Sequence, residues 1–480
     1  NFCCVGRIAR LPALPMSSSV GEPPDLLAAY KAALDATATP PCAPLLKLLE
    51  DAVENDVPIA TLNLREAGLG AAGAAALAAM LKRDSFMTYA NLEENDLGDE
   101  GVTHIAEALC THESVFRLDL GYNKVSGRGV KALAALLTES PSLLCLDLSG
   151  NNLWSRLSYF APASLSALAP LGRALASPGC KLQLLHLDQA DVEPKGLGSL
   201  VDGLLDNKVL VNLRLGENAL DVKSAHVLAR LLEGNQTLTS LDLRDNKLGD
   251  EGAAVVGAAL AKNTGLHCLV LWSNAIAPHG VAAFAEASAP NGTLQILDLG
   301  ANQVGRDGAE ALKSSLVHNT GLHTLGLADA SLGEEGGIAI AESLEGNAHL
   351  QRVDLRRNRL GVAGLMALHL SMKTNEAVQE MAMDAVEASI DNKELQEQFQ
   401  REILAACQLN GVRKGGAATA SASGAASDVA PLAMKMMSGM SFAAPEPTSE
   451  ADPNAVRMVR QPPGPTPTPS PHPRAEPEHP

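Results

Sequence analysis

Residues 238–248 read Leu-Thr-Ser-Leu-Asp-Leu-Arg-Asp-Asn-Lys-Leu, and residues 266–276 read Leu-His-Cys-Leu-Val-Leu-Trp-Ser-Asn-Ala-Ile. Both stretches fit the pattern L-x-x-L-x-L-x-x-N-x-L, with Leu or Ile at the last position. The pattern occurs eleven times, and its asparagine position falls at Ala67, Asn95, Asn123, Asn151, Ala190, Asn218, Asn246, Asn274, Asn302, Ala330 and Asn358. Every step is 28 residues except the one from Asn151 to Ala190. A fixed period of this size predicts a solenoid of stacked repeats.

Each copy of the pattern predicts a strand, a turn and a helix. Leu241 and Leu243 alternate, so on a strand both point to the same side, into the stack. The asparagine amide can bond backbone groups that the turn leaves free, so weaker turns are expected at the three alanines. Two apolar columns, which start at Leu77 and Leu81 and recur in later repeats, predict a helix. The fold class is therefore α/β, a leucine-rich-repeat horseshoe of the ribonuclease-inhibitor class. About eleven parallel strands should form its concave sheet, with helices on the convex side.

Composition divides the chain into five segments. They are a disordered N-terminus (1–24), a helical cap (25–58), eleven repeats (59–375), a degenerate repeat with a second helical cap (376–410), and a disordered Ala/Pro-rich tail (411–480). In the second cap, Leu395, Phe399, Ile403 and Leu404 are expected to form the covering stripe. About eleven residues are inserted near 154–164. The chain begins with Asn rather than Met, and we interpret its start as a partial N-terminus without a signal peptide.

Charge and cysteine usage restrict the partners. The net charge of -18 argues against binding to nucleic acid or to an anionic membrane, and no apolar run is long enough to span a bilayer. The eight cysteines show no C-x-x-C spacing, which is typical of reduced, intracellular proteins, cytoplasmic or also nuclear. The twelve histidines form no pair with metal-ligand spacing, so neither a metal nor a cofactor is expected.

One motif could be read as a nucleotide site. Residues 68–73 form G-x-G-x-x-G between a predicted strand and a predicted helix. The same glycine register returns at Gly98 and Gly101 and at Gly249 and Gly252, so we interpret these glycines as part of the repeat. No Walker loop, nucleophile elbow or H-E-x-x-H motif is present. The chain is therefore predicted not to be an enzyme.

The outward-facing strand positions point to a binding surface. The residue between the two strand leucines is acidic in many repeats, and this acidic column is interrupted near Trp272 by an apolar island. Tryptophan is enriched at binding hot spots, although Trp272 could instead pack on its own neighbours. The predicted partner-binding residues on the concave face are Asp242, Arg244, Val270, Trp272, Ile296, Asp298, Asp354 and Arg356.

Three stretches carry a family resemblance. The runs C-L-V-L-W-S-N at 268–274, L-G-L-A at 325–328 and V-D-L-R-R-N-R-L-G-V-A-G-L-M-A-L at 353–368 resemble the protein phosphatase 1 regulatory subunit 37 family. The resemblance covers roughly residues 25–410. It implies a non-catalytic protein that binds the protein phosphatase 1 catalytic subunit and inhibits it. It also implies a Lys/Arg-Val-x-Phe docking peptide ahead of the repeats and a Pro-rich tail. The tail matches in kind, but these 480 residues contain no basic-Val-x-Phe peptide.

Two alternatives use the same repeat architecture. A regulator of the Ran GTPase-activating type would suit the acidic balance and would stimulate GTP hydrolysis, but the long acidic tail of that class is not found in this sequence. The second alternative is a general leucine-rich-repeat scaffold with an unknown client, which would bind other proteins through the concave face.

Overall fold

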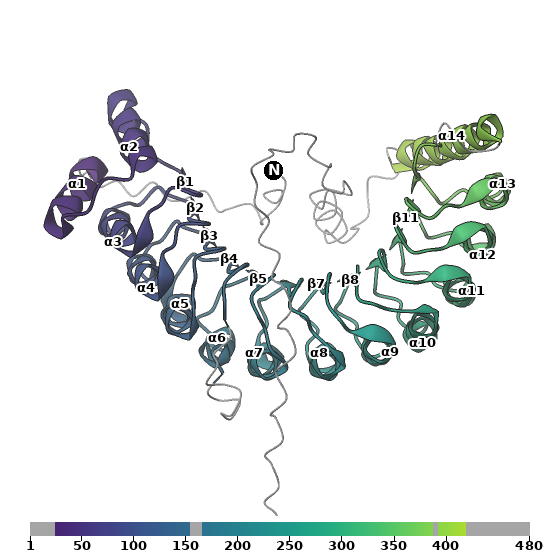
Figure 1. Ribbon diagram of the computed structural model, residues 1–480, viewed down its shortest axis with the longest axis horizontal. Helices are drawn as coiled ribbons and strands as arrows, with labels where there is room; N and C mark the ends of the chain where they lie inside the picture. The colour runs from purple at the N-terminus through teal and green to yellow at the C-terminus, as the bar shows by residue number, and fades with distance from the viewer. Residues whose placement is uncertain (1–24, 154–165, 387–391, 419–480) are drawn as a thin grey trace, which may run out of the picture. The chain divides into compact units, whose positions relative to one another are not determined.

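Short strands and longer helices alternate along the computed structural model, which describes residues 25–153, 166–386 and 392–418 (Figure 1). The strands are β1 (Thr61–Asn63), β2 (Tyr89–Asn91), β3 (Arg117–Asp119), β4 (Cys145–Asp147), β5 (Leu184–His186), β6 (Asn212–Arg214), β7 (Ser240–Asp242), β8 (Cys268–Val270), β9 (Ile296–Asp298), β10 (Thr324–Gly326), β11 (Arg352–Asp354) and β12 (Glu380–Ala382). The helices are α1 (Leu26–Thr37), α2 (Ala43–Asn55), α3 (Gly70–Leu81), α4 (Gly98–Leu109), α5 (Gly127–Glu139), α6 (Ala169–Leu175), α7 (Pro194–Asp206), α8 (Val222–Gly234), α9 (Gly249–Leu260), α10 (Pro278–Ser288), α11 (Gly305–Leu316), α12 (Gly333–Gly346), α13 (Gly361–Met372) and α14 (Lys393–Ala418).

The strands form one open parallel sheet in chain order, β1 to β12, within the described residues. Equivalent residues pair, for example Leu241 with Leu269 and Leu269 with Leu297. In the repeat array, strands line the inner side and helices the outer side (Figure 1). Neighbouring strands lie about 4.8 Å apart, whereas packed helices lie about 8–10 Å apart, so the helix side must be longer and the sheet side becomes concave. The predicted fold class is confirmed.

The core lies between the sheet and the helices, where the predicted apolar columns meet. Leu241 and Leu243 are fully buried, and so are the helix residues Leu77 and Leu81. Small residues allow neighbouring helices to approach closely. A Cβ atom at Gly101 would lie 3.1 Å from the Ala71 Cα and 3.2 Å from the Ala74 Cβ of the preceding repeat. This close contact explains the glycine that recurs six residues after the asparagine position.

Buried asparagine side chains connect each repeat to the one before it. The Asn302 Nδ2 group donates to the carbonyl oxygens of Leu271, Leu299 and Gly300, at 2.8, 2.9 and 3.1 Å. Its Oδ1 accepts from the backbone N–H groups of Asn274 and Ile276, at 2.9 and 3.1 Å. Equivalent bonds are made by Asn123, Asn151, Asn218, Asn246 and Asn358. At Asn274 the ladder is incomplete, because its buried Oδ1 has no hydrogen-bond partner among the described residues. The motif asparagines thus bond the backbone groups of the turns, as predicted.

A second asparagine ladder follows the helices and was missed in the sequence. Asn263 Nδ2 donates to the carbonyls of Leu232 and Asn235, at 2.7 and 3.1 Å. Its Oδ1 accepts from the backbone N–H groups two and three residues later, those of Gly265 and Leu266. The series, again spaced by 28, is Asn207, Asn235, Asn263, Asn291, Asn319, Asn347 and Asn375. From Asn207 to Asn375, each helix-to-strand connection therefore has its own asparagine bridge to the preceding repeat.

Helices close both ends of the described sheet. Tyr30 of α1 is fully buried, and its hydroxyl accepts from the Cys42 N–H at 3.0 Å. At the other end, Ile403 and Cys407 of α14 are buried, and Asn410 Nδ2 donates to the carbonyls of Asn375 and Val378, both at 2.9 Å. Through Asn410, α14 continues the second asparagine ladder beyond the last helix-to-strand connection.

Three expectations need correction. The sheet has a twelfth strand, because the degenerate segment supplies β12, which pairs with β11 and buries Met381 where most other repeats have leucine. The covering stripe of α14 includes Phe399 and Ile403 but not Leu395 and Leu404, which are 40% and 42% exposed. Leu404 follows Ile403 by one residue and so lies about 100° further around the helix. The predicted insertion near 154–164, the N-terminal segment 1–24 and residues 419–480 of the predicted tail lie outside the described residues. Residues 411–418, which were predicted to belong to the disordered tail, instead form the end of α14.

Replacing one ladder asparagine tests its structural role. We expect Asn302→Ala to lower the free energy of unfolding by about 2–4 kcal/mol, because it leaves several buried backbone groups without partners. The exposed neighbour Gln303 supplies the control, since Gln303→Ala should change stability by less than about 0.5 kcal/mol. Urea denaturation followed by circular dichroism measures both. Equal stability of the two variants would show that the ladder contributes little.

Candidate functional site

Three rows of side chains run across the concave sheet, because alternate strand residues point to the same face. We name them from the order along each strand. In β9 the first row is Ile296, the central row is Asp298, and the last row, just beyond the strand, is Gly300. The central row reads Asn63, Asn91, Asp119, Asp147, His186, Arg214, Asp242, Val270, Asp298, Gly326, Asp354 and Ala382. These rows contain all eight predicted binding residues.

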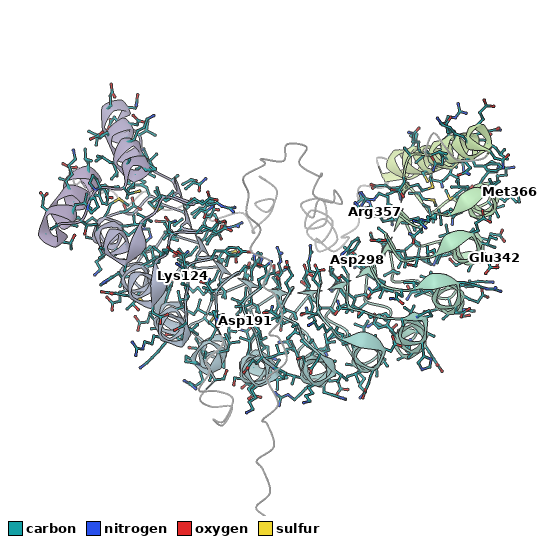
Figure 2. All side chains as sticks on the ribbon, in the orientation of Figure 1. Lys124, Asp191, Asp298, Glu342, Arg357 and Met366 are labelled. Carbon is teal, nitrogen blue, oxygen red and sulfur yellow. The ribbon has the colours of Figure 1, made fainter. Side chains whose placement is uncertain are left out.

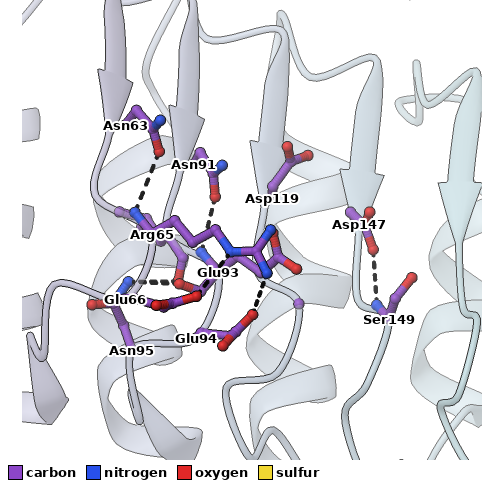
Figure 3. Close-up of polar contacts among 12 residues, drawn as sticks. Asn63, Arg65, Glu66, Asn91, Glu93, Glu94, Asn95, Asp119, Asp147 and Ser149 are labelled. Carbon is purple, nitrogen blue, oxygen red and sulfur yellow. Dashed lines mark hydrogen bonds and ion pairs between the residues drawn. The ribbon is translucent and has the colours of Figure 1, made fainter. Parts of the chain in front are cut away.

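Ion pairs dominate the N-terminal part of this face (Figure 3). Arg65 of the last row lies 3.2 Å from Glu93 and 3.5 Å from Glu66, and it also contacts Glu94. Burial raises the pKa of Glu93, although Arg65 opposes that shift. The Asp147 carboxylate accepts from the Ser149 N–H at 2.8 Å, and His186 lies 3.4 Å away. Burial opposes ionisation of Asp147, but His186 and Ser149 lower its pKa well below the usual range.

Arginines neutralise most buried carboxylates of the central row. Arg244 Nε donates to Asp242 Oδ1 at 3.0 Å and Nη2 donates to Oδ2 at 2.6 Å, so the pair is bidentate. Arg356 forks over Asp354 in the same way, with contacts of 2.9 and 2.6 Å. Arg117, from the first row, holds Asp119. The acidic column that the sequence predicts is therefore largely a row of internal ion pairs.

Asp298 differs from these carboxylates. It is 7% exposed, and its Oδ1 accepts from the Gly300 N–H at 2.9 Å. Within the described residues, no lysine, arginine or histidine lies within ion-pair distance of it. Burial raises the pKa of Asp298 from 3.8 to about 6; the Gly300 N–H and Arg244 lower it, whereas Asp354 and Asp242 raise it. Figure 2 places Asp298 on the strand side of the array, away from Glu342 and Met366 on the helix side.

The sequence contains a signal for this difference that our sequence analysis did not use. Asp242 and Asp354 are each followed two positions later by arginine, whereas Asp298 is followed by Gly300. A side chain two positions along a strand lies on the same face and can reach back to the carboxylate. The absence of arginine at position 300 therefore predicts that Asp298 lacks this partner.

Trp272 lies across the neighbouring repeat. A Cβ atom at Gly300 would lie only 2.2 Å from two carbons of the indole ring, so the ring covers the glycine that takes the same place one repeat later. Trp272 itself remains partly exposed. The two other apolar residues predicted near Trp272 are less accessible, because Val270 and Ile296 are only 1% and 3% exposed. These short side chains stand in close-packed rows and project less than the indole, so Trp272 provides the accessible apolar surface.

The glycines of the G-x-G-x-x-G motif at 68–73 have a backbone conformation that recurs in other repeats. Gly68 lies in the turn before α3 and Gly70 is the first residue of that helix, with φ angles of +66° and +59°. Gly98 and Gly249, the first residues of α4 and α9, have the same conformation as Gly70. No three His, Cys, Asp or Glu side chains converge as metal ligands in the described ranges. In the same ranges, no helix has the length and apolarity needed to cross a membrane.

Comparisons with known proteins gave one matching family model and several similar solved structures. The family model described as "Leucine Rich repeat" matches residues 115–134, 234–257, 291–313 and 346–368. An internalin from Listeria monocytogenes is 19% identical, with 78% of this chain and 98% of that chain covered and a TM-score of 0.37. The leucine-rich-repeat protein LegL7 from Legionella pneumophila is also 19% identical, with coverages of 67% and 92% and a TM-score of 0.38. No curated protein matches the chain.

The recurring motif, the single parallel sheet and the repeat model that matches four stretches show that the chain has the leucine-rich-repeat fold. In such solenoids the extended concave surface is the usual binding face for other proteins.

The raised pKa of Asp298 predicts a pH-dependent effect on stability. A carboxyl group with a higher pKa in the folded state binds more protons when folded, so its contribution to stability falls as pH rises from about 4 to about 6. We expect Asp298→Asn to stabilise the protein by about 1–3 kcal/mol at pH 7 and to have almost no effect at pH 4. Urea unfolding of both proteins at the two pH values measures this. A difference that does not change with pH would contradict it.

Proposed function

We propose that this chain is a non-catalytic scaffold that binds a protein partner on its concave face. One observation carries the proposal: the three rows form a continuous surface on a backbone fixed by two asparagine ladders. The ladder asparagines recur from repeat to repeat, whereas the side chains of the three rows differ from one repeat to the next. A rigid surface binds with little loss of conformational entropy, which favours recognition of a folded or extended protein segment.

The centre of the proposed surface is Trp272 and its immediate surroundings. The indole is supported from below by Gly300, so little side-chain freedom is lost when a partner covers it. The ion pairs of Asp242 with Arg244 and of Asp354 with Arg356 lie on either side along the sheet. A supported aromatic side chain with a polar rim is a common composition for a protein-binding hot spot.

The finer proposal is that the partner is the protein phosphatase 1 catalytic subunit and that binding lowers its activity. Its support is the sequence resemblance over residues 25–410. In this proposal, a Val-x-Phe docking peptide supplies affinity by adding a strand to the edge of a phosphatase sheet. The repeats then act at high effective concentration and cover the catalytic cleft or exclude other subunits.

Truncation of Trp272 tests the binding face. We expect Trp272→Ala to weaken binding of a purified partner, the phosphatase catalytic subunit first, by about 2 kcal/mol, which is about 30-fold in Kd. Phe86→Ala is the control, because Phe86 is 52% exposed and lies outside the three rows. Isothermal titration calorimetry measures both variants. Equal affinities for the two would assign Trp272 a packing role only.

A fusion experiment tests the phosphatase proposal itself. We expect the 480-residue chain to inhibit the catalytic subunit weakly, and a Lys-Val-Xaa-Phe peptide fused ahead of residue 1 to lower the inhibitory concentration by about 10²-fold or more. The control fusion carries Ala at the Val and Phe positions. Activity on a phosphopeptide substrate is the measurement. If neither fusion inhibits the enzyme, the phosphatase proposal is wrong and the general scaffold proposal stands.

A further inference from the structure

Asp298 stands among neutral neighbours on the concave sheet. The strand register places Val270 and Gly326 beside it on β8 and β10. Ile296 and Gly300 precede and follow it on the same face of its own strand. The four diagonal positions are Cys268, Trp272, Thr324 and Ala328. None of these eight residues carries a charge.

The other buried carboxylates of the central row do not share this environment. Asp119, Asp242 and Asp354 each contact an arginine, with Nη2–Oδ2 distances of 2.9, 2.6 and 2.6 Å. Transfer of an ionised carboxylate out of water without a cation is costly, and a lone backbone N–H offsets only part of that cost. Asp298 is therefore a buried acid whose environment favours an added cation.

The aromatic ring and the small residues beside Asp298 suit a planar cation. The Asp298 side chain leans over Gly326, since a Cβ atom there would lie 2.4 Å from Oδ1. The Trp272 ring lies over Gly300, whose N–H donates to the same carboxylate. The indole and the carboxylate thus meet at Gly300, and the small residues Gly326 and Ala328 leave the next strand without bulky side chains.

We propose that Asp298 and Trp272 together bind the guanidinium group of an arginine from a basic segment of the protein partner. The inference rests on the proposed function of the concave face and adds the chemistry of the partner. A guanidinium can stack on an indole while it donates to a carboxylate, and arginine fits both demands better than lysine. Exposed acids in the turns after the strands, Glu66, Glu217, Asp245 and Asp329, complement a basic segment.

The probe for this site is a hexa-arginine peptide, and the readout is tryptophan fluorescence. The chain has two tryptophans, so Trp154→Phe leaves Trp272 as the single indole. In that background, hexa-arginine should change the fluorescence of Trp272 saturably, and hexa-lysine should bind more weakly. Asp298→Asn should weaken hexa-arginine binding by at least about tenfold. Glu251→Gln is the matched control, because it removes one carboxylate from an exposed position on the outer helix α9 and should change binding less than about twofold.

Each outcome decides the inference. Loss of affinity in Asp298→Asn alone, with an unchanged circular dichroism spectrum, supports it. Equal losses in both variants would show general attraction to an acidic protein and would overturn the site at Asp298. No fluorescence change with hexa-arginine would also overturn it. Neither negative result affects the proposed scaffold function, because partner binding is measured separately with Trp272→Ala.

Discussion

The buried asparagine side chain that bridges consecutive repeats is the interaction on which this structure depends. A short parallel strand followed by a turn leaves backbone N–H and C=O groups inside the stack, where water cannot reach them. Asn302 alone engages two N–H groups and three carbonyls of two repeats. Since one amide satisfies groups on both sides, each repeat is held in register with its neighbour. The leucines can then align in columns, and the sheet extends through twelve strands.

This fixed backbone determines where functional variation can occur. Residues that point into the stack must remain apolar or belong to a ladder, whereas the three concave rows are free to differ. Most of the charges in these rows are balanced internally by arginine–aspartate pairs, and the net charge of -18 therefore describes the concave face poorly. The region from β8 to β10 is different, because there a supported indole lies beside a carboxylate with no cation among the described residues.

Much of the fold could be predicted because the same residue types recur at equivalent positions in most repeats, where they meet the same packing and hydrogen-bonding requirements. Leu241, Leu243 and the motif asparagines recur at one spacing, and one copy explains all of them. The second ladder was missed although Asn207 to Asn375 also recur every 28 residues, because its first three equivalents are Asp84, His112 and Ser140. β12 was missed because its segment has Val378, Met381 and Met383 at the motif leucine positions and also lacks the motif asparagine. The burial of Val270 and Ile296 depends on how neighbouring strands pack. The alternation of residues within one strand shows only which face a side chain lies on, not how deeply it is buried. The bidentate ion pairs of Asp242 with Arg244 and of Asp354 with Arg356 could have been predicted, because arginine follows aspartate by two residues on the same face of the strand.

The central claim is that the concave sheet is the surface that meets the partner. Hydrogen exchange of the chain, alone and saturated with the phosphatase catalytic subunit, tests it most directly. The account predicts slower exchange in the strands and following turns from β7 to β11, with unchanged exchange in the outer helices α8 to α12. Protection confined to those helices, or no protection anywhere in the repeats, would contradict it.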